Sequence, residues 1–185
     1  MSKNKYINIP KIGDVLFEKS RKAKGLIISV KSPSCVRVAV PRFISIKKAE
    51  SYVYQKLDWI ITQQNKLSNK VNILELITST TPDEKLKIVM QTKKLAEKYN
   101  YTFNKLTIRK MRTRWGSCTS KNNISLNIGL VALPDDLREY IILHELLHTR
   151  IKNHSKEFWN KLGNLIPNPK ALNRKLSQNY GLYEI

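Results

Sequence analysis

The N-terminal third of the chain shows the alternation of apolar and polar positions that is typical of β-strands. Residues 25–30 and 35–40 are short runs rich in valine and isoleucine, and the valines of the second run occupy alternate positions. Residues 31–34 between them form a polar turn, and Pro41 ends the second run. The pattern predicts two strands joined by a turn.

The periodicity then changes to the spacing of helices. Ser45 can cap a helix that begins at Ile46, and apolar residues at helical intervals continue this helix to about Leu67. Residues 68–80 have the character of a loop, and the short apolar run 71–77 within it predicts no defined element.

A second helix has a well-marked start. Thr81 is a capping residue, Pro82 occupies the first helical position, and Glu84 completes a capping box. We expect this helix to end near Asn100. Its predicted buried stripe consists of Leu86, Val89, Met90 and Leu95.

A hairpin and a long helix are predicted in the second half of the chain. Residues 115–118 and 124–128 flank a polar turn at residues 119–123, which predicts a pair of strands. Pro134 and the two acidic residues after it begin a helix that we expect to stop near residues 152–153.

Two further helices, capped by Ser155 and Asn168, complete the predicted elements. Together the elements predict an α+β protein with two parts. Residues 1–70 form a β-rich unit with one helix, and residues 71–185 form a second unit with a short sheet and several helices.

Composition adds a strong positive charge. The chain has 34 Lys and Arg against 14 Asp and Glu, a formal net charge of +20. Such a charge favours polyanionic partners such as nucleic acid. A compositional habit of the source explains the scattered lysines equally well, so the charge makes nucleic acid a candidate partner without identifying one.

Cysteine content and hydropathy point to the cytoplasm. Cys35 and Cys118 are the only cysteines, too few for a disulfide framework. The sequence has no signal-peptide pattern and no run of the roughly 20 apolar residues that a transmembrane helix needs. We therefore expect a cytoplasmic protein without membrane attachment, and the sequence does not indicate its oligomeric state.

All three histidines of the chain lie within one short segment. His144 and His148 are four positions apart on a predicted helix, so both imidazoles point to the same side and can bind one metal ion. A catalytic zinc ion takes three protein ligands and a water. Glu145 lies beside such an ion, where its carboxylate can take a proton from the water and pass it to a leaving amine. The motif predicts a zinc-dependent hydrolase that cleaves peptide bonds.

His154 is the candidate for the third ligand. It follows His148 by six residues, so on a continuous helix it would face about 240° away. Asn153 tolerates the left-handed conformation that ends helices, and Ser155 can start the next helix. The sequence therefore predicts a turn that brings His154 to the metal.

A second cluster of unusual residues precedes the metal-binding helix. It consists of Arg112, Arg114, Trp115, Ser117 and Cys118. A hairpin that carries these residues can line the cleft, with an arginine on a substrate carboxylate or a developing oxyanion. A packed tryptophan beside two solvated cations is the alternative, and the sequence does not choose between them.

Asn127 is a further candidate for substrate contact. It lies on the strand before the metal-binding helix, and zinc peptidases often bind an extended peptide at an edge strand. Its neighbours Leu126 and Ile128 are expected to lie in an ordinary core strand.

With these clusters the chain resembles the YgjP-like metallopeptidases, a bacterial family also called domain of unknown function 45. The resemblance is carried by residues 114–118, 124–127, 136–140, 144–148 and 153–159. It implies a minimal zincin-like core, with a three-stranded antiparallel sheet against the active-site helix and three histidine ligands. It also suggests kinship with the SprT-like proteases, which cut proteins crosslinked to DNA.

Two other functions stay open. The first is a metal-dependent nucleotide pyrophosphatase with Arg and Lys on the phosphates, although no glycine-rich phosphate loop is visible. The second is a basic, nucleic-acid-associated module in which zinc is structural. A structural zinc ion needs a fourth protein ligand, and Cys118 is the only nearby thiol.

Overall fold

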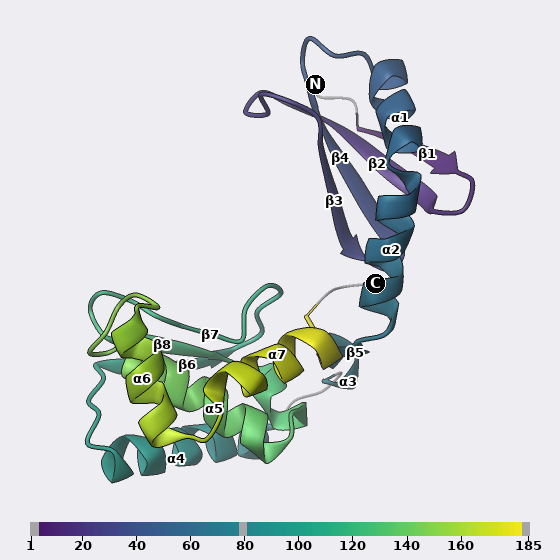
Figure 1. The fold of residues 1–185 in the computed structure, drawn as a ribbon. Coiled ribbons are helices and arrows are strands. Elements are labelled where there is room, and N and C mark those ends of the chain that lie inside the picture. Colours follow the sequence, from purple (N-terminus) through teal and green to yellow (C-terminus); the bar gives the residue numbers. More distant parts are fainter. Residues whose placement is uncertain (1–3, 78–80, 183–185) are drawn as a thin grey trace. The chain divides into compact units, whose positions relative to one another are not determined.

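The computed structural model describes residues 4–77 and 81–182, which form two compact units that each contain helices and strands (Figure 1). The first unit comprises residues 4–71 and the second comprises residues 72–182. The chain is therefore a mixed α and β protein, as its sequence predicts. Within the described residues, no helix is long and apolar enough to cross a membrane.

The first unit is built on a four-stranded sheet in the order β1-β2-β4-β3. Its strands are β1 (Lys5–Ile9), β2 (Gly13–Ser20), β3 (Ile27–Ser32) and β4 (Cys35–Pro41). The β1–β2 and β3–β4 pairs are antiparallel, whereas β2 and β4 run parallel. The strand pair predicted at residues 25–40 is confirmed as β3 and β4, but the sequence pattern does not predict β1 and β2.

Two helices complete this unit. They are α1 (Ile46–Gln55) and α2 (Leu57–Ser68). The Oγ of Ser45 accepts the N–H of Lys48 at 3.2 Å, so the predicted cap is confirmed. The prediction of one uninterrupted helix is wrong, because the N–H of Lys56 bonds to the carbonyl of Val53, three residues back, at 3.0 Å. A bond of this type tightens the turn and interrupts the α-helix.

The remaining elements lie in the second unit, except that β5 begins at Val71, the last residue of the first unit. They are β5 (Val71–Asn72), α3 (Ile73–Leu76), α4 (Pro82–Lys98), β6 (Lys105–Arg109), β7 (Gly116–Cys118), β8 (Asn123–Asn127), the 3-10 helix η1 (Ile128–Ala132), α5 (Asp135–Leu147), α6 (Lys156–Leu165), α7 (Pro169–Asn179) and β9 (Tyr180–Gly181). The apolar run at residues 71–77 thus forms β5 and α3 rather than a loop, and residues 78–80 of the predicted loop lie outside the described residues.

The sheet of the second unit has the strand order β6-β8-β7. The β7–β8 pair is antiparallel, which confirms the predicted hairpin, but β6 and β8 run parallel. The expectation of a purely antiparallel sheet is therefore wrong. The chain reverses once between β6 and β7 and again between β7 and β8, and it places β6 and β7 on opposite sides of β8. Because β8 is central, Leu126 is fully buried, as expected for a core strand.

Helix α4 begins with the predicted capping box, in which Thr81 and Glu84 bond each other's backbone N–H groups. The predicted buried stripe is wrong at two positions, because Leu86 is 53% exposed and Met90 is 62% exposed. Leu95 is buried as predicted, and the other buried residues of the helix are Ile88, Thr92 and Ala96. Thr92 can be buried because its hydroxyl donates to the carbonyl of Ile88 at 2.7 Å.

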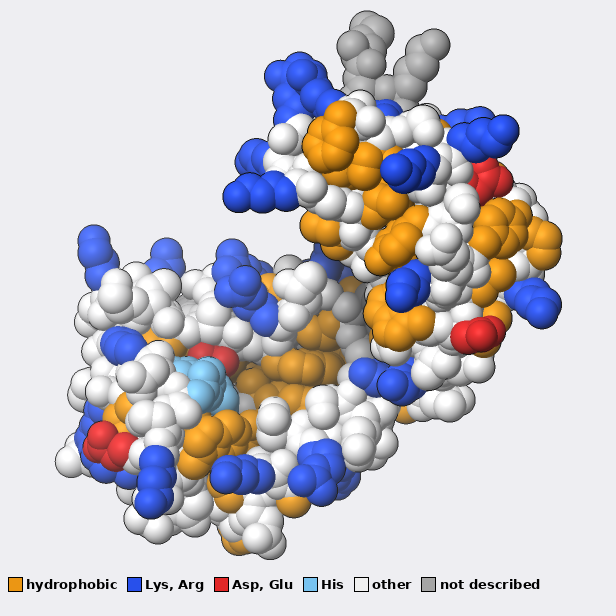
Figure 2. Space-filling view, turned by 45° about the horizontal axis from the view of Figure 1, so that its top comes forward, with side chains coloured by type: hydrophobic (Ala, Val, Ile, Leu, Met, Phe, Trp, Pro, Cys, Tyr) orange, Lys and Arg blue, Asp and Glu red, His pale blue; other side chains and the backbone are white. Residues whose placement is uncertain are grey.

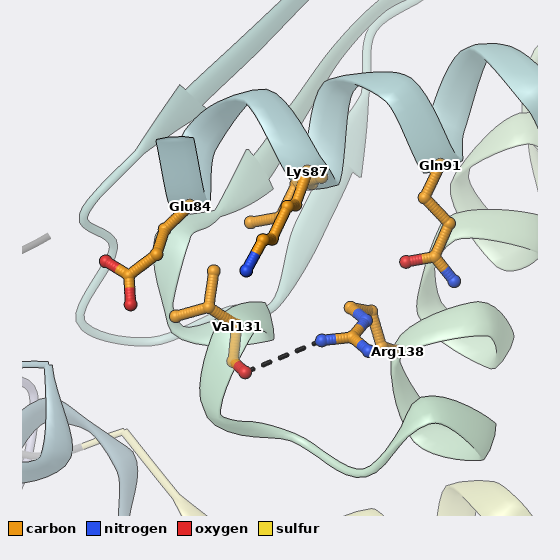
Figure 3. A pocket seen from close by; sticks show the side chains of 6 residues that line it. Glu84, Lys87, Gln91, Val131 and Arg138 are labelled. Atoms are coloured by element: carbon orange, nitrogen blue, oxygen red, sulfur yellow. Dashed lines mark hydrogen bonds between the residues drawn. The ribbon is translucent and has the colours of Figure 1, made fainter. Parts of the chain in front are cut away.

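Helix α5 runs through the core of the second unit, where it contacts α4, α6, α7 and the sheet. Its buried apolar residues are Leu137, Tyr140, Ile141, Ile142, Leu143, Leu146 and Leu147. Near the start of α5, Arg138 donates to the carbonyl of Val131 at 3.5 Å and faces a small pocket beside α4, which Lys87 also lines (Figure 3). Packing on several sides fixes the helix that carries the histidine pair.

Candidate metal centre

The metal-binding helix ends earlier than its sequence predicts. Helix α5 stops at Leu147, and His148 is its C-cap residue, rather than near residues 152–153. The N–H groups of Arg150 and Ile151 both bond back to the carbonyl of Leu147 at 3.0 Å, which closes a turn. The early stop gives the chain enough residues to return to the helix end before α6 begins.

The turn does not use the predicted left-handed residue. Among the described residues with positive φ, the non-glycine positions are Lys11, Asn100, Asn122 and Asn168, so the expectation for Asn153 is wrong. The side chain of Asn153 instead accepts the N–H of Ser155 at 3.3 Å. Ser155 caps α6 as predicted, since its Oγ accepts the N–H of Phe158 at 3.4 Å.

The Nε2 atoms of the three histidines converge on one point. They are separated by 3.1 Å between His144 and His148, 3.2 Å between His148 and His154, and 2.9 Å between His144 and His154. Nitrogen ligands about 2.0–2.1 Å from a tetrahedral zinc ion lie about 3.3–3.4 Å apart. The three nitrogens therefore fit one small cation of this kind, and the structure brings together all three residues that the sequence singles out.

Neighbouring groups hold the imidazoles in this arrangement. The Nδ1 of His148 lies 2.8 Å from the carbonyl of Ile151, and a hydrogen bond donated there leaves the Nε2 lone pair free for a metal. The ring of Phe158 stacks on His148 with centroids 4.6 Å apart and meets the rings of His144 and His154 edge-on at 4.9 Å.

Phe158 lies beside the three histidines, whereas the sequence pattern predicts only that it belongs to a helix. It is fully buried at the start of α6, and it contacts every imidazole of the site. The signal that could have revealed it is its position: a large aromatic residue three places after the cap of the helix that follows the third histidine.

Burial keeps His144 and His148 in the form that binds metal. Burial lowers the pKa of His144 to about 3, and the neighbouring His148 and His154 add to this effect. Burial also lowers the pKa of His148. Only neutral imidazole has a lone pair to offer a metal, so the pKa shifts prepare the site for binding at neutral pH.

Glu145 lies beside the histidines in a space that Gly116 leaves open. The carboxyl group is 7% exposed, and a Cβ atom on Gly116 would lie only 2.6 Å from its Cγ and Oε1. Burial raises the pKa of Glu145 to about 7, and the charge of Arg114 opposes this rise. A carboxyl group with this pKa can both accept and return a proton near neutral pH.

A pocket of about 300 Å³ opens over these groups. It is lined by Gly116, Ser117, Cys118, His144, Glu145, His148, Lys152 and His154. Figure 2 shows the imidazoles, in pale blue, reaching the surface in a hollow of this unit. A substrate group can therefore approach the histidine cluster directly from solvent.

The residues of the arginine cluster have different surroundings. Ser117 and Cys118 line the pocket through β7, while Arg112 and Arg114 are exposed on the loop before β7. Trp115 is partly buried and packs against the hydrophobic core. Lys152, which no sequence motif marks, also lines the pocket. Its position between the second and third histidines is the sequence feature that could have indicated this role.

Asn127 has a structural position, and the expectation that it contacts substrate is wrong. Its side chain is fully buried. The amide nitrogen donates to the carbonyls of Met111 at 2.7 Å and Arg114 at 3.0 Å, and the amide oxygen accepts the N–H of Gly129 at 3.0 Å. Asn127 therefore ties the loop before β7 to the segment after β8, and it is not available to a substrate.

Cys118 is not grouped with the histidines. Among residues 4–77 and 81–182, the one set of side chains placed to share a metal consists of His144, His148 and His154. The sulfur of Cys118 lies 3.6 Å from the carbonyl of Thr119, and burial raises the pKa of the thiol. The site thus offers three side chains that could hold a metal beside an open pocket, the arrangement expected of a catalytic rather than a structural metal centre.

A convergent histidine triad beside a buried glutamate defines a metal-dependent hydrolase. The chain belongs to the YgjP-like family, whose metallopeptidase domain matches residues 83–179, more than half of the sequence. It is therefore a metallopeptidase, and the matched region contains every residue of the triad. No curated protein matches the chain.

Two solved structures resemble about half of the chain. The metallopeptidase zymogen of Methanocaldococcus jannaschii, jannalysin, is 28% identical over 49% of this chain and 94% of its own, with a TM-score of 0.44. The metallopeptidase zymogen of Pyrococcus abyssi, abylysin, is 21% identical over 51% of this chain and 98% of its own, also with a TM-score of 0.44.

Proposed function

We propose that residues 72–182 form the catalytic unit of a zinc peptidase, in which His144, His148 and His154 hold the metal and Glu145 is the general base. The observation that carries this proposal is the convergence of three Nε2 atoms within 3.2 Å of one another, next to a buried carboxyl group. Three imidazole ligands suit zinc better than magnesium or calcium, which prefer oxygen ligands. When bound, zinc supplies a Lewis acid that polarises a carbonyl group and lowers the pKa of water.

Glu145 carries the proton in this proposal. Its carboxylate accepts a proton from the attacking water and returns it to the leaving amine. The pKa of about 7 suits both transfers at neutral pH. Gly116 contributes by leaving room for the carboxyl group, because any side chain there would displace it.

Strand β7 offers a place for the substrate backbone. It is an outer strand of its sheet, and all three of its residues line the pocket. An extended peptide can add to such an edge through backbone hydrogen bonds. A peptide bound in this way would run past the histidines and Glu145.

The two alternative functions are less well supported. The family match is to a metallopeptidase domain, which favours peptide over nucleotide substrates. A structural zinc ion would need a fourth ligand, and within the described residues Cys118 does not join the histidine group.

Cleavage of an unfolded, fluorescently labelled protein tests the proposed function. We expect zinc-loaded protein to cleave it, chelation to stop cleavage, and added zinc to restore it. Glu145→Gln should keep the zinc and lose at least about 1,000-fold in kcat, because the variant lacks the proton acceptor. Normal turnover by Glu145→Gln would refute the role of Glu145 as general base. A zinc-loaded wild type that cleaves nothing would refute the proposed peptidase activity.

We further propose a cytoplasmic location, supported by the two cysteines, which are both free. Nucleic acid stays a predicted partner on the basis of the net charge of +20. Titration of the protein into labelled single- and double-stranded DNA at several salt concentrations tests this prediction. Affinity that falls steeply with salt would support it, and no binding at low salt would refute it.

A further inference from the structure

We propose that Arg114 and Lys152 select peptides that carry carboxylate groups on both sides of the scissile bond. This inference rests on the proposed peptidase function and names the class of substrate for the same site. It starts from the position of two cations at opposite ends of β7, the strand that lines the pocket.

Lys152 lies at the C-terminal end of β7. Its Nζ donates to the carbonyl of Thr119 at 3.0 Å and to the Oδ1 of Asn122 at 2.5 Å, and it lies 3.8 Å from the sulfur of Cys118. These neutral partners hold the ammonium group at the pocket without cancelling its charge. An ammonium group has three donors, and these three neutral acceptors share them, so a substrate carboxylate would interact with the group through its uncompensated positive charge.

Arg114 lies at the other end of β7, two residues before Gly116. Its carbonyl accepts a hydrogen bond from the buried amide of Asn127, which fixes the backbone at this point. The side chain of Arg114 is exposed on the loop before β7. The three-residue strand is only about 10 Å long, so a peptide bound along it would need only a few residues to reach from Arg114 to Thr119, where Lys152 lies.

The surroundings contain little negative charge to neutralise these cations. The segment from residue 99 to residue 134, which includes all three strands of the sheet, has six Lys and Arg and no Asp or Glu. Among the residues that line the pocket, Glu145 is the single acidic one. Figure 2 shows Lys and Arg side chains, in blue, on several sides of the hollow, with few acidic side chains nearby.

Carboxylate groups on the substrate supply the missing partners. A peptide extended along β7 would place its flanking side chains near one cation at each end. Acidic residues in those positions gain an ion pair at each end, whereas basic residues meet like charge. Each exposed ion pair of this kind strengthens binding about two- to fivefold. We therefore expect an acidic peptide to be preferred over a neutral one about tenfold in total.

Matched peptides test the inference. One peptide is neutral and amidated at its C-terminus, the second has Glu on both sides of the cleaved bond and is also amidated, and the third is neutral with a free C-terminal carboxylate. Measurement of kcat/KM at low salt should show the second peptide cleaved about tenfold faster than the first, with the preference shrinking at 1 M salt. The third peptide distinguishes a terminal carboxylate from acidic side chains as the recognised group.

Paired variants separate charge from packing. Arg114→Gln and Lys152→Gln should each reduce the preference about two- to fivefold through KM, whereas Arg114→Lys and Lys152→Arg should retain most of it. Lys87→Gln is the control, because Lys87 lines a different pocket beside α4 (Figure 3). Equal cleavage of acidic and neutral peptides by the wild type, or a full preference in both glutamine variants, would overturn the inference.

Binding measurements keep this test separate from the test of peptidase function. The affinities of the same peptides for zinc-loaded Glu145→Gln protein can be followed by tryptophan fluorescence without turnover. Preferential binding of the acidic peptide would support the inference even if no peptide were cleaved. If the peptides are cleaved but the acidic one is not preferred, the proposed peptidase function stands and the proposed selection of acidic substrates is refuted.

Discussion

Substitution of Gly116 by alanine is expected to inactivate the enzyme without unfolding it. The added Cβ would lie 2.6 Å from the Cγ and Oε1 of Glu145 and 2.8 Å from its Cδ. Carbon atoms in contact are normally about 3.5–4.0 Å apart, so the carboxyl group must move by about 1 Å. A displacement of this size in a catalytic group costs about 100-fold in rate. The backbone of Gly116 does not have a positive φ, so alanine adds no strain of that kind.

The assay compares kcat/KM, zinc content and thermal stability of the variant with those of the wild type. We expect kcat/KM to fall about 100-fold, with one zinc still bound, because the three atoms nearest the added carbon all belong to Glu145 and none to a histidine. Gly163→Ala on α6 is the matched control, since nothing lies within 4 Å of the added carbon, and it should remain fully active. An active Gly116→Ala enzyme would refute the reasoning that this glycine positions Glu145.

Three further predictions concern the groups around the site. Phe158→Ala should destabilise the zinc-loaded protein by about 3–5 kcal/mol in chemical denaturation, because a fully buried ring that contacts all three imidazoles is lost; an unchanged midpoint would contradict this. Asn127→Ala should cost about 1–3 kcal/mol, since it leaves two carbonyls and one N–H without their partner, and full stability would show that water replaces the amide. In metal-free protein the raised pKa of Glu145 stabilises the fold fully below about pH 4.5, and this contribution is lost as the pH rises to about 7. Wild type should therefore lose stability relative to Glu145→Gln across that interval, and parallel stability curves would refute the raised pKa.

The sequence predicts the catalytic helix and the hairpin well because strong local signals mark both. Pro134 with two acidic residues begins α5, and a polar turn separates the strands β7 and β8. The convergence of the histidines also follows from local spacing, since the i, i+4 pair fixes two of the ligands. Ser155 as a helix cap then limits where the third can lie.

The remaining errors arise where tertiary contacts decide the structure. Strand β1 is mostly exposed, with only Ile9 fully buried, so its alternation of polar and apolar residues is weak. On α4 the buried stripe includes Thr92, which hydropathy alone places at the surface. The early end of α5 depends on backbone bonds to Leu147 that no local residue type announces.

Tertiary contacts also explain the wrong prediction at the site. Asn127 is a polar residue on a strand next to the metal-binding helix, so its type suggests substrate contact. Its side chain makes three buried hydrogen bonds, two to carbonyls that are distant in sequence and one to an N–H two residues ahead. These bonds can be seen only in the folded chain. Likewise, only the folded chain reveals that Gly116 leaves space for the side chain of Glu145.

Zinc content measured by elemental analysis tests the central claim most directly. Purified wild type and Glu145→Gln should each contain one zinc per chain, whereas His154→Ala should lose the metal or bind it far more weakly, because one of three converging nitrogens is gone. Zinc absent from the wild type after reconstitution, or retained at full affinity by His154→Ala, would contradict the assignment of these three histidines as the metal centre.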